Sequence, residues 1–277
     1  MWPVMLDGVV ASSRLSYTKP ANWLSSKPKV GFEPGSIRFN IESEGDEPAK
    51  DRNRTSRREH MMDGKIALDR LDPTRTALVV VHMVKGVAGE VDTPFNRLFL
   101  HRAKEKGVIN AQLRLLEEFR RAKAKVVYTA VTYQQGLPGV SPTSPLWRTL
   151  FDCVCLMEGT PAVELMDELA RRPDEPVVRG QAANGFDRTI LDTILRVAGV
   201  DTLVLVGIAT DVAVESTARA ASDLGYRTIV VSDACTADSD DSHARSLAVL
   251  QKWFAETPTA DEVLSALGAP RIKPARA

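Results

Sequence analysis

Short apolar runs recur along the chain from residue 65 onward, and stretches with helical spacing of apolar residues lie between them. The runs are rich in β-branched residues and are apolar along nearly their whole length, as expected of parallel strands that are covered on both faces. They occupy residues 77–81, 125–131, 176–178, 203–207 and 228–232. The pattern therefore predicts strands that belong to one buried sheet.

Three stripes of apolar or small residues at helical spacing predict helices between the strands. The stripes are Ile109, Leu113, Leu116 and Phe119; Ile190, Leu191, Ile194 and Leu195; and Ala213, Thr217, Ala220 and Leu224. Alternation of strand and helix is typical of a doubly wound, mostly parallel α/β sheet flanked by helices. Ligands of such sheets bind beyond the carboxyl ends of the strands. Site residues are therefore expected just after each strand.

A change in composition at about residue 65 predicts the domain organisation. Residues 1–64 are rich in proline, glycine, serine and charge, without a sustained period, which is typical of a flexible N-terminal extension. Met61 and Met62 stand just before the regular pattern, so an over-extended start is the alternative. Residues 65–268 are predicted to form a single α/β domain, and residues 269–277 a tail.

The overall composition narrows the function classes. The 277 residues are 44% hydrophobic and contain 36 basic and 36 acidic side chains, so we expect neither nucleic acid nor an anionic membrane as partner. No apolar run approaches the ~20 residues that a membrane-spanning helix needs. The N-terminus has no basic residues before its apolar ones, which argues against a signal peptide. These features predict a cytoplasmic protein.

The three cysteines are too few, and odd in number, for a disulfide framework. Cys153 and Cys155 lie too close together, and lack the partners, for a zinc site, so we expect them to be small buried residues. Cys235 follows a later strand and is also expected to be packed.

The stretch "VLVGIATDVAVESTARAA", residues 204–221, is built like an active-site corner. An apolar strand runs into Gly207, crosses a short turn and enters a predicted helix at about Asp211. Amides and the positive dipole end of a helix favour an anionic nucleophile at such a point. The first turn nevertheless carries only Val212, Ala213 and Val214, none of which is reactive.

Two segments around this corner resemble the isochorismatase-like family of cysteine hydrolases. They are "TALVVVHMVKG", which looks like the first strand of the family, and residues 177–235, which match its C-terminal half; the resemblance covers about residues 67–256. In the family, a catalytic Asp precedes Met in the first strand, a Lys precedes a Gly-Phe-x-x-Thr-x-Leu segment, and a nucleophilic Cys follows Gly-x-x-Thr-x-x. The resemblance thus implies a base, a cation and a thiol that act together on an amide or a related carbonyl.

All three catalytic positions are changed in this chain. His82 stands at the Asp position and Ala213 at the Cys position. The Lys position falls on Arg179 if the loop has one extra residue, and on Gly180 if it does not. Because a methyl group cannot attack a carbonyl, the resemblance implies that cysteine-dependent amidase activity is absent.

Other side chains at the corner are candidates for binding or for a substitute nucleophile. The resemblance implies substrate contacts from Tyr133, Phe186, Ala209 and Thr210. Thr210 is otherwise expected to cap the helix. Ser216 lies nearly one helical turn after Ala213 and is expected to face away from the corner.

Two functions remain open from the sequence. The first is a degenerate binding or scaffold protein without the nucleophile. The second is a hydrolase or lyase that acts without cysteine on a small anionic amide, ureide or vinyl ether, with His82 as general acid or base and Arg179 as anion anchor. An engineered change from Cys to Ala213 is a further, narrower hypothesis, weakened by the other two changes.

The segments after the first two strands also depart from the family pattern. Residues 84–107 are long and charged and carry Phe95, Phe99 and His101, which indicates either a lid or a flap between subunits, since family members are commonly oligomeric. We therefore expect a homo-oligomer. Residues 132–139 lack the Asp-x-His that nicotinamidases in the family use for a metal, so we expect no metal and no other cofactor. His243 is expected to be a surface or interface residue.

Overall fold

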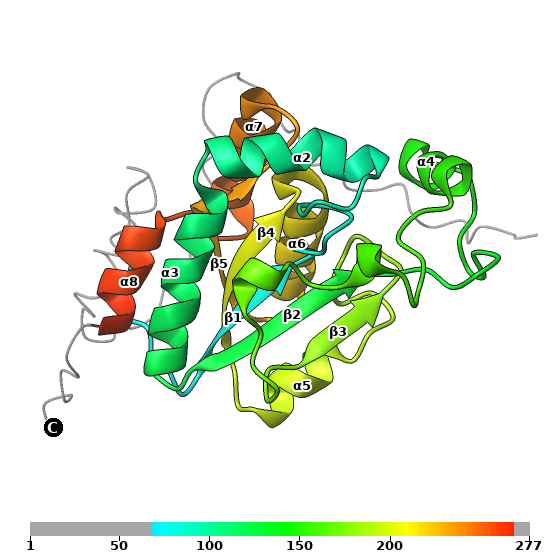
Figure 1. The fold of residues 1–277 in the computed structure, drawn as a ribbon. Helices are drawn as coiled ribbons and strands as arrows, with labels where there is room; N and C mark the ends of the chain where they lie inside the picture. The colour runs from blue at the N-terminus through cyan, green and yellow to red at the C-terminus, as the bar shows by residue number, and fades with distance from the viewer. Residues whose placement is uncertain (1–67, 269–277) are drawn as a thin grey trace, which may run out of the picture. The chain divides into compact units, whose positions relative to one another are not determined.

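The structure is a computed structural model that describes residues 68–268, in which five parallel strands form one sheet (Figure 1). The strands are β1 Thr76–Val81, β2 Lys125–Val131, β3 Val177–Gly180, β4 Thr202–Ile208 and β5 Arg227–Thr236. Their order is β3-β2-β1-β4-β5, and every neighbouring pair is parallel. The predicted doubly wound α/β fold and all five strand positions are confirmed. The predicted N-terminal extension and tail lie outside the described residues.

Successive side chains of a strand point to opposite faces of the sheet. Because the strands are apolar on both faces, helices cover each of them. Leu78 and Val80 of β1 belong to the cluster on one face, while Val79 and Val81 belong to the cluster on the other. The first face is covered by α2 Pro94–Glu105, α3 Val108–Arg121, α4 Pro145–Cys153 and α8 Ala260–Gly268. The second is covered by α5 Leu191–Val197, α6 Glu215–Asp223 and α7 Asp240–Trp253. None of the helices among residues 68–268 is long and apolar enough to cross a membrane.

The predicted helical stripes need small corrections. The buried face of α3 includes Val108 and Leu115, whereas Ile109 and Leu113 are only partly buried. Ile190 and Leu224 are exposed, because they lie at the N-cap of α5 and the C-cap of α6 rather than inside those helices.

The strand order creates a switch point between β1 and β4. The chain leaves β1 for β2 on one side, whereas β4 and β5 extend the sheet on the other. Val81 is paired with Gly207, and a Cβ atom at residue 207 would lie 2.1 Å from the carbonyl oxygen of Val81. With φ at +133°, this position requires glycine. The close approach brings His82 beside the corner that follows β4, where a doubly wound sheet binds its ligand.

Candidate functional site

A cavity of about 250 Å³ lies at this switch point. Its walls come from the residues after β1, β2 and β4, together with side chains of α2 and α4. Most of these side chains are aliphatic or aromatic. The polar side chains in the lining are His82, Tyr133, Asp211 and Asp238. Neither Met83 nor Phe186 lines the cavity, so the space that the sequence pattern assigns to an active site stays open.

The corner after β4 carries Ala209 and Ala213 into the cavity lining. The sequence predicts that the chain enters an α-helix directly after this corner. The chain instead forms a π-helical turn over Thr210–Val214 that continues into α6. Ala213 is 4% exposed, and its side chain ends in a methyl group. The position that the family pattern assigns to a thiol therefore holds no reactive atom.

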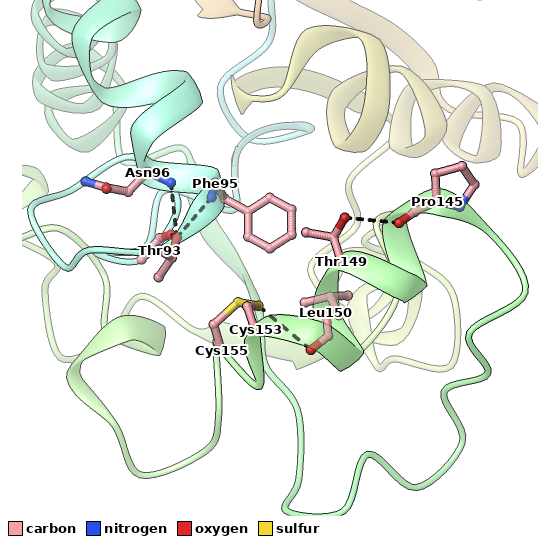
Figure 2. The surroundings of a disulfide bond; sticks show 9 residues. Thr93, Phe95, Asn96, Pro145, Thr149, Leu150, Cys153 and Cys155 are labelled. Carbon is pink, nitrogen blue, oxygen red and sulfur yellow. Dashed lines mark hydrogen bonds between the residues drawn. A yellow bond between two sulfur atoms is a disulfide. The ribbon is translucent and has the colours of Figure 1, made fainter.

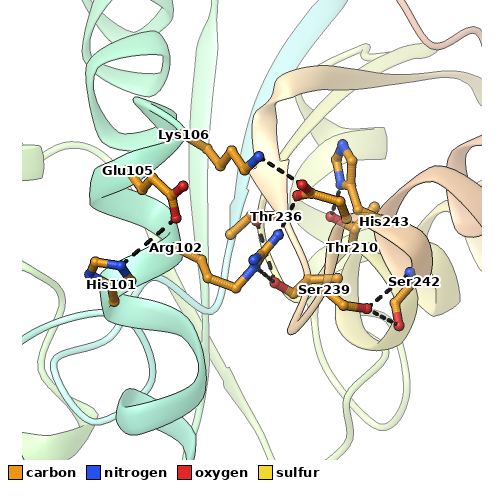
Figure 3. Close-up of polar contacts among 11 residues, drawn as sticks. His101, Arg102, Glu105, Lys106, Thr210, Thr236, Ser239, Ser242 and His243 are labelled. Carbon is orange, nitrogen blue, oxygen red and sulfur yellow. Dashed lines mark hydrogen bonds and ion pairs between the residues drawn. The ribbon is translucent and has the colours of Figure 1, made fainter.

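Thr210 and His243 bond to each other behind this corner. The Thr210 side chain is fully buried, and its Oγ1 lies 2.8 Å from Nδ1 of His243 (Figure 3). Ala209, not Thr210, is the N-cap of the turn, and it makes no side-chain cap bond. The predicted capping role of Thr210 is thus wrong, because its hydroxyl is committed to α7. The His243 ring is half-buried and bonded to the corner after β4, and its expected place at the surface or at an interface stays a prediction.

Neither Ser216 nor Cys235 presents a free nucleophile to the cavity. Ser216 donates a hydrogen bond to the Val212 carbonyl oxygen at 2.6 Å and approaches the Ala213 carbonyl oxygen at 3.2 Å, so its hydroxyl points back into its own helix. Cys235 is 3% exposed and does not line the cavity, as its predicted packing role requires. Burial raises the pKa of its thiol to about 12, which keeps it protonated.

His82 lies at the cavity with both ring nitrogens engaged. Its Nε2 lies 3.1 Å from the Ala183 carbonyl oxygen, and its Nδ1 lies 3.3 Å from Oγ1 of Thr129. Because a carbonyl oxygen only accepts, Nε2 carries the proton and Nδ1 accepts from the Thr129 hydroxyl. The ring is 5% exposed, and burial lowers its pKa below the ordinary value. His82 is therefore a neutral, fixed group.

Arg179 and Gly180 lie away from His82 and Ala213. They pair with the last residues of β2, and Arg179 is exposed, with Nη1 donating to the Val163 carbonyl oxygen at 3.2 Å. Both line a separate polar cavity of about 370 Å³. The two candidate Lys positions thus bring no charge to the apolar cavity. His82 and Arg179 therefore line different cavities.

The two aromatic candidates are separated as well. Phe186 stacks on Tyr226 with ring centroids 6.0 Å apart and packs on the opposite face of the sheet. Tyr133 lines the cavity, is 2% exposed and meets Trp147 edge-on, with ring centroids 6.1 Å apart. Burial raises the pKa of the Tyr133 phenol, and its hydroxyl makes no hydrogen bond with any of residues 68–268. Of the predicted contact residues, Tyr133 and Ala209 line the cavity beside Ala213, whereas Phe186 and Thr210 do not.

The start of α2 is set by a cap and forms one wall of the cavity. Oγ1 of Thr93 accepts hydrogen bonds from the amides of Phe95 and Asn96, each at 3.1 Å (Figure 2). Pro94, with its fixed φ, occupies the first helical turn. Phe95 projects toward α4 in Figure 2 and, with Leu98, lines the cavity.

The far end of α2 is attached to α7 by ion pairs. Arg102 and Lys106 both pair with Asp240, and Arg102 Nε also donates to the Ala237 carbonyl oxygen at 2.9 Å (Figure 3). His101 is exposed and faces Glu105, so it does not reach the cavity. The segment that follows β1 therefore walls the cavity. A flap between subunits of a homo-oligomer stays a prediction.

Cys153 and Cys155 form a disulfide at the end of α4 (Figure 2). Both are partly exposed, so their predicted role as small buried residues is wrong. Val154 between them is the C-cap of α4, in the left-handed region with φ at +47°, and the turn brings the two Cα atoms to 5.1 Å. Leu150 and Leu156 on either side of the disulfide line the cavity.

Asp211 and Asp238 are the lining residues that the sequence patterns missed. Asp211 is the second residue of the π turn and is partly buried; Asp238 follows the end of β5 and is exposed. Burial raises the pKa of Asp211, and the carboxylates of Asp238 and Glu215 raise it further. Asp238 could have been predicted as a site residue, because it lies two residues after the end of β5, where ligands of such sheets bind. No cluster of three or more metal-ligating side chains is found within residues 68–268.

Residues 76–262 match the model of the Isochorismatase domain, which is more than half of the chain. This chain belongs to the isochorismatase family. An uncharacterized isochorismatase family protein of Bacillus subtilis, YwoC, is 30% identical over 196 residues, covering 70% of this chain and 95% of that protein.

Relatives with a named activity are hydrolases. The ureidoacrylate amidohydrolase RutB of Agrobacterium fabrum is 32% identical over 183 residues, which cover 59% of this chain and 77% of that protein. The crystal structure of a cysteine hydrolase from Pseudomonas syringae pv. phaseolicola has a TM-score of 0.64 at 27% identity, with 73% of this chain and 96% of that chain covered. The isochorismatase family member described here thus has the hydrolase fold over residues 76–262.

Proposed function

We propose that this family member binds a small, largely apolar molecule at the switch-point cavity and does not hydrolyse amides through a thiol. The observation that carries the proposal is Ala213. Its methyl group lines the cavity at the corner where the family pattern has a nucleophilic cysteine. The relatives named for amide hydrolysis supply the contrast, because that chemistry needs an attacking atom.

The state of His82 supports binding over an alternative acid–base reaction. Its Nε2–H is donated to Ala183 and its Nδ1 accepts from Thr129, so neither nitrogen is left to exchange a proton with a ligand. A general acid or base must lie within hydrogen-bond reach of the proton that it moves. Arg179, the expected anion anchor, lies outside the cavity. Neither His82 nor Arg179 therefore supports the hydrolase or lyase hypothesis.

The cavity itself supports a ligand over a purely structural role. A degenerate active site that serves only as scaffold has no reason to keep its apolar walls apart, since filling such a void with side chains stabilises a fold. Ligand sites in proteins combine mostly apolar walls with a few polar groups. Tyr133, with its unpartnered hydroxyl, and the two aspartates meet that description.

Binding of indole, a small neutral aromatic probe, tests the proposal. We expect indole to raise the melting temperature of the full chain in proportion to its occupancy, because a ligand of the native state stabilises by mass action. Ala213→Leu places three further carbon atoms in the cavity and is expected to abolish the shift. The matched control is Ala220→Leu, on a partly exposed position of α6 that does not line the cavity.

Two results would contradict the proposal. One is an indole shift that survives Ala213→Leu, which would locate binding elsewhere. The other is turnover of an amide or ureide by the native chain that is lost when its thiols are blocked. Absence of binding by indole and by every other small probe would instead favour the scaffold role.

A further inference from the structure

The charged residues that line the cavity indicate which charge its ligand carries. Among the residues within 68–268 that line the cavity, none is a lysine or an arginine, and two are aspartates. His82 is neutral. The expectation of a small anionic ligand rested on Arg179, which lies outside this cavity. The electrostatic preference of the site is therefore the reverse of that expectation.

The two aspartates have no counter-charge of their own. Neither Asp211 nor Asp238 forms an ion pair with any residue that the structure describes. Glu215, which is close to Asp211, is already paired with Arg219 at 2.7 Å and accepts a hydrogen bond from Ser246. Asp211 and Asp238 are thus available to a ligand, while Glu215 is not.

Two basic side chains of α2 are held by other groups. Arg102 and Lys106 of α2 are both paired with Asp240, and Arg102 also donates to Ala237. The His243 ring, beside Asp211, is half-buried, and burial lowers its pKa, so it is neutral at neutral pH. Within residues 68–268, no lysine or arginine lines the cavity to supply a positive charge beside the two aspartates.

Tyr133 gives an independent indication that a ligand enters. It is 2% exposed, it lines the same cavity, and its hydroxyl has no partner within the described residues. This hydroxyl is accessible from the cavity and can form a hydrogen bond with a ligand atom. The aromatic rings of Phe95 and Phe99 in the same lining suit the apolar body of a ligand.

We infer that the ligand of this cavity is an organic amine, with an apolar body against the walls from α2 and α4 and an ammonium group between Asp211 and Asp238. This inference rests on the proposed function and names its ligand class. The ammonium donates to the two carboxylates, and the apolar body displaces water from the aliphatic and aromatic walls. A carboxylate of the same shape would meet two like charges.

A series of matched ligands tests the inference by calorimetric titration of the full chain. Phenylpropylamine, phenylpropanol and phenylpropionate share one body and differ in the charge of the end group. We expect the amine to bind at least about tenfold more tightly than the alcohol, and the carboxylate most weakly. Added salt is expected to weaken binding of the amine and to leave binding of the alcohol unchanged.

Variants assign the effect to the two aspartates. Asp211→Asn and Asp238→Asn each are expected to reduce the preference for amine over alcohol, while phenylpropanol binds as before. Asp223→Asn, at the end of α6 and outside the cavity, is the matched control. Equal affinity for all three ligands, or tightest binding of the carboxylate, would overturn the inference and leave the proposed function standing. If no member of the series bound while indole did, the inference alone would fall; if indole did not bind either, both would fall.

Discussion

At the amino end of β3, Arg120 donates two hydrogen bonds to Glu175, at 2.7 and 2.8 Å, whereas Asp211 and Asp238 beyond the opposite end of the sheet have no cationic partner. Glu175 is buried and also accepts from the Arg172 amide at 2.8 Å. Burial alone would raise the pKa of Glu175, but the hydrogen bonds from Arg120 and Arg172 outweigh it and hold the pKa below its ordinary value.

The difference between the two ends separates stability from function. A buried charge whose hydrogen bonds are all made by the protein contributes to one fixed conformation and has nothing left for a ligand. Carboxylates and a hydroxyl that lack a partner among the described residues are available to a ligand that supplies the complementary groups. Substitutions at the two ends should therefore have opposite consequences, with stability changing at one and binding at the other.

The largest effect is expected from Glu175→Gln at the paired end. The substitution leaves the guanidinium of Arg120 buried without its counter-charge, since the Arg120 and Glu175 side chains are 11% and 6% exposed. Loss of one partner of a buried pair costs about 3–5 kcal/mol in the free energy of unfolding. Denaturant titration measures the change.

The exposed pair of Arg75 and Asp201 supplies the control for this experiment. Its side chains are 59% and 44% exposed, so Asp201→Asn is expected to cost less than about 1 kcal/mol. If Glu175→Gln were no more destabilising than Asp201→Asn, or if it weakened ligand binding without lowering stability, the contrast between the two ends would fail.

A pH-dependent effect of intermediate size is expected from His82. Its pKa in the folded protein is lowered from 6.5 by burial, so below pH 6.5 the unfolded chain binds a proton that the folded chain excludes. Stability is then fully present above pH 6.5 and is lost as the pH falls toward the lowered pKa, by up to about 1.4 kcal/mol per pH unit.

Comparison of the native chain with His82→Gln isolates this contribution. The variant lacks the titrating ring, so its free energy of unfolding should fall less steeply below pH 6.5. His101→Gln, at an exposed position, should keep the native slope. A His82→Gln curve parallel to the native one would mean that His82 is protonated in the folded state and free to act as an acid.

The strands and the positions of His82 and Ala213 were predictable because each depends on local sequence. β-branched runs such as 77–81 and 125–131 predict buried strands, and the Gly207 corner has a recognisable spacing. The composition of the cavity was not predictable, because its residues come from separate segments. Whether Arg179 enters the cavity or Asp238 reaches its rim depends on how strand ends and loops pack, which neither periodicity nor motif spacing encodes.

The side-chain partnerships escaped prediction for a similar reason. The Thr210–His243 bond joins residues 33 apart in the chain, and the two nitrogens of His82 bond to Thr129 and Ala183 from other segments. The disulfide is local, yet it depends on the left-handed conformation of Val154, which the sequence does not specify for a valine.

The smallest effect is expected from Ala213→Cys, which restores only the thiol of the family pattern. A cysteine at residue 213 would lie in an apolar cavity near a neutral His82 whose nitrogens are occupied, with Asp211 close by in the chain, and such surroundings raise the pKa of a thiol. We expect hydrolysis of amide and ureide substrates by Ala213→Cys to stay at the level of the native chain. His82→Asp combined with Ala213→Cys supplies the missing carboxylate and serves as the comparison, in which slow turnover is the expected gain. A clear rate from Ala213→Cys alone would mean that the carboxyl end of the sheet still holds a working base, and that its unpaired groups are catalytic rather than a binding site for an amine.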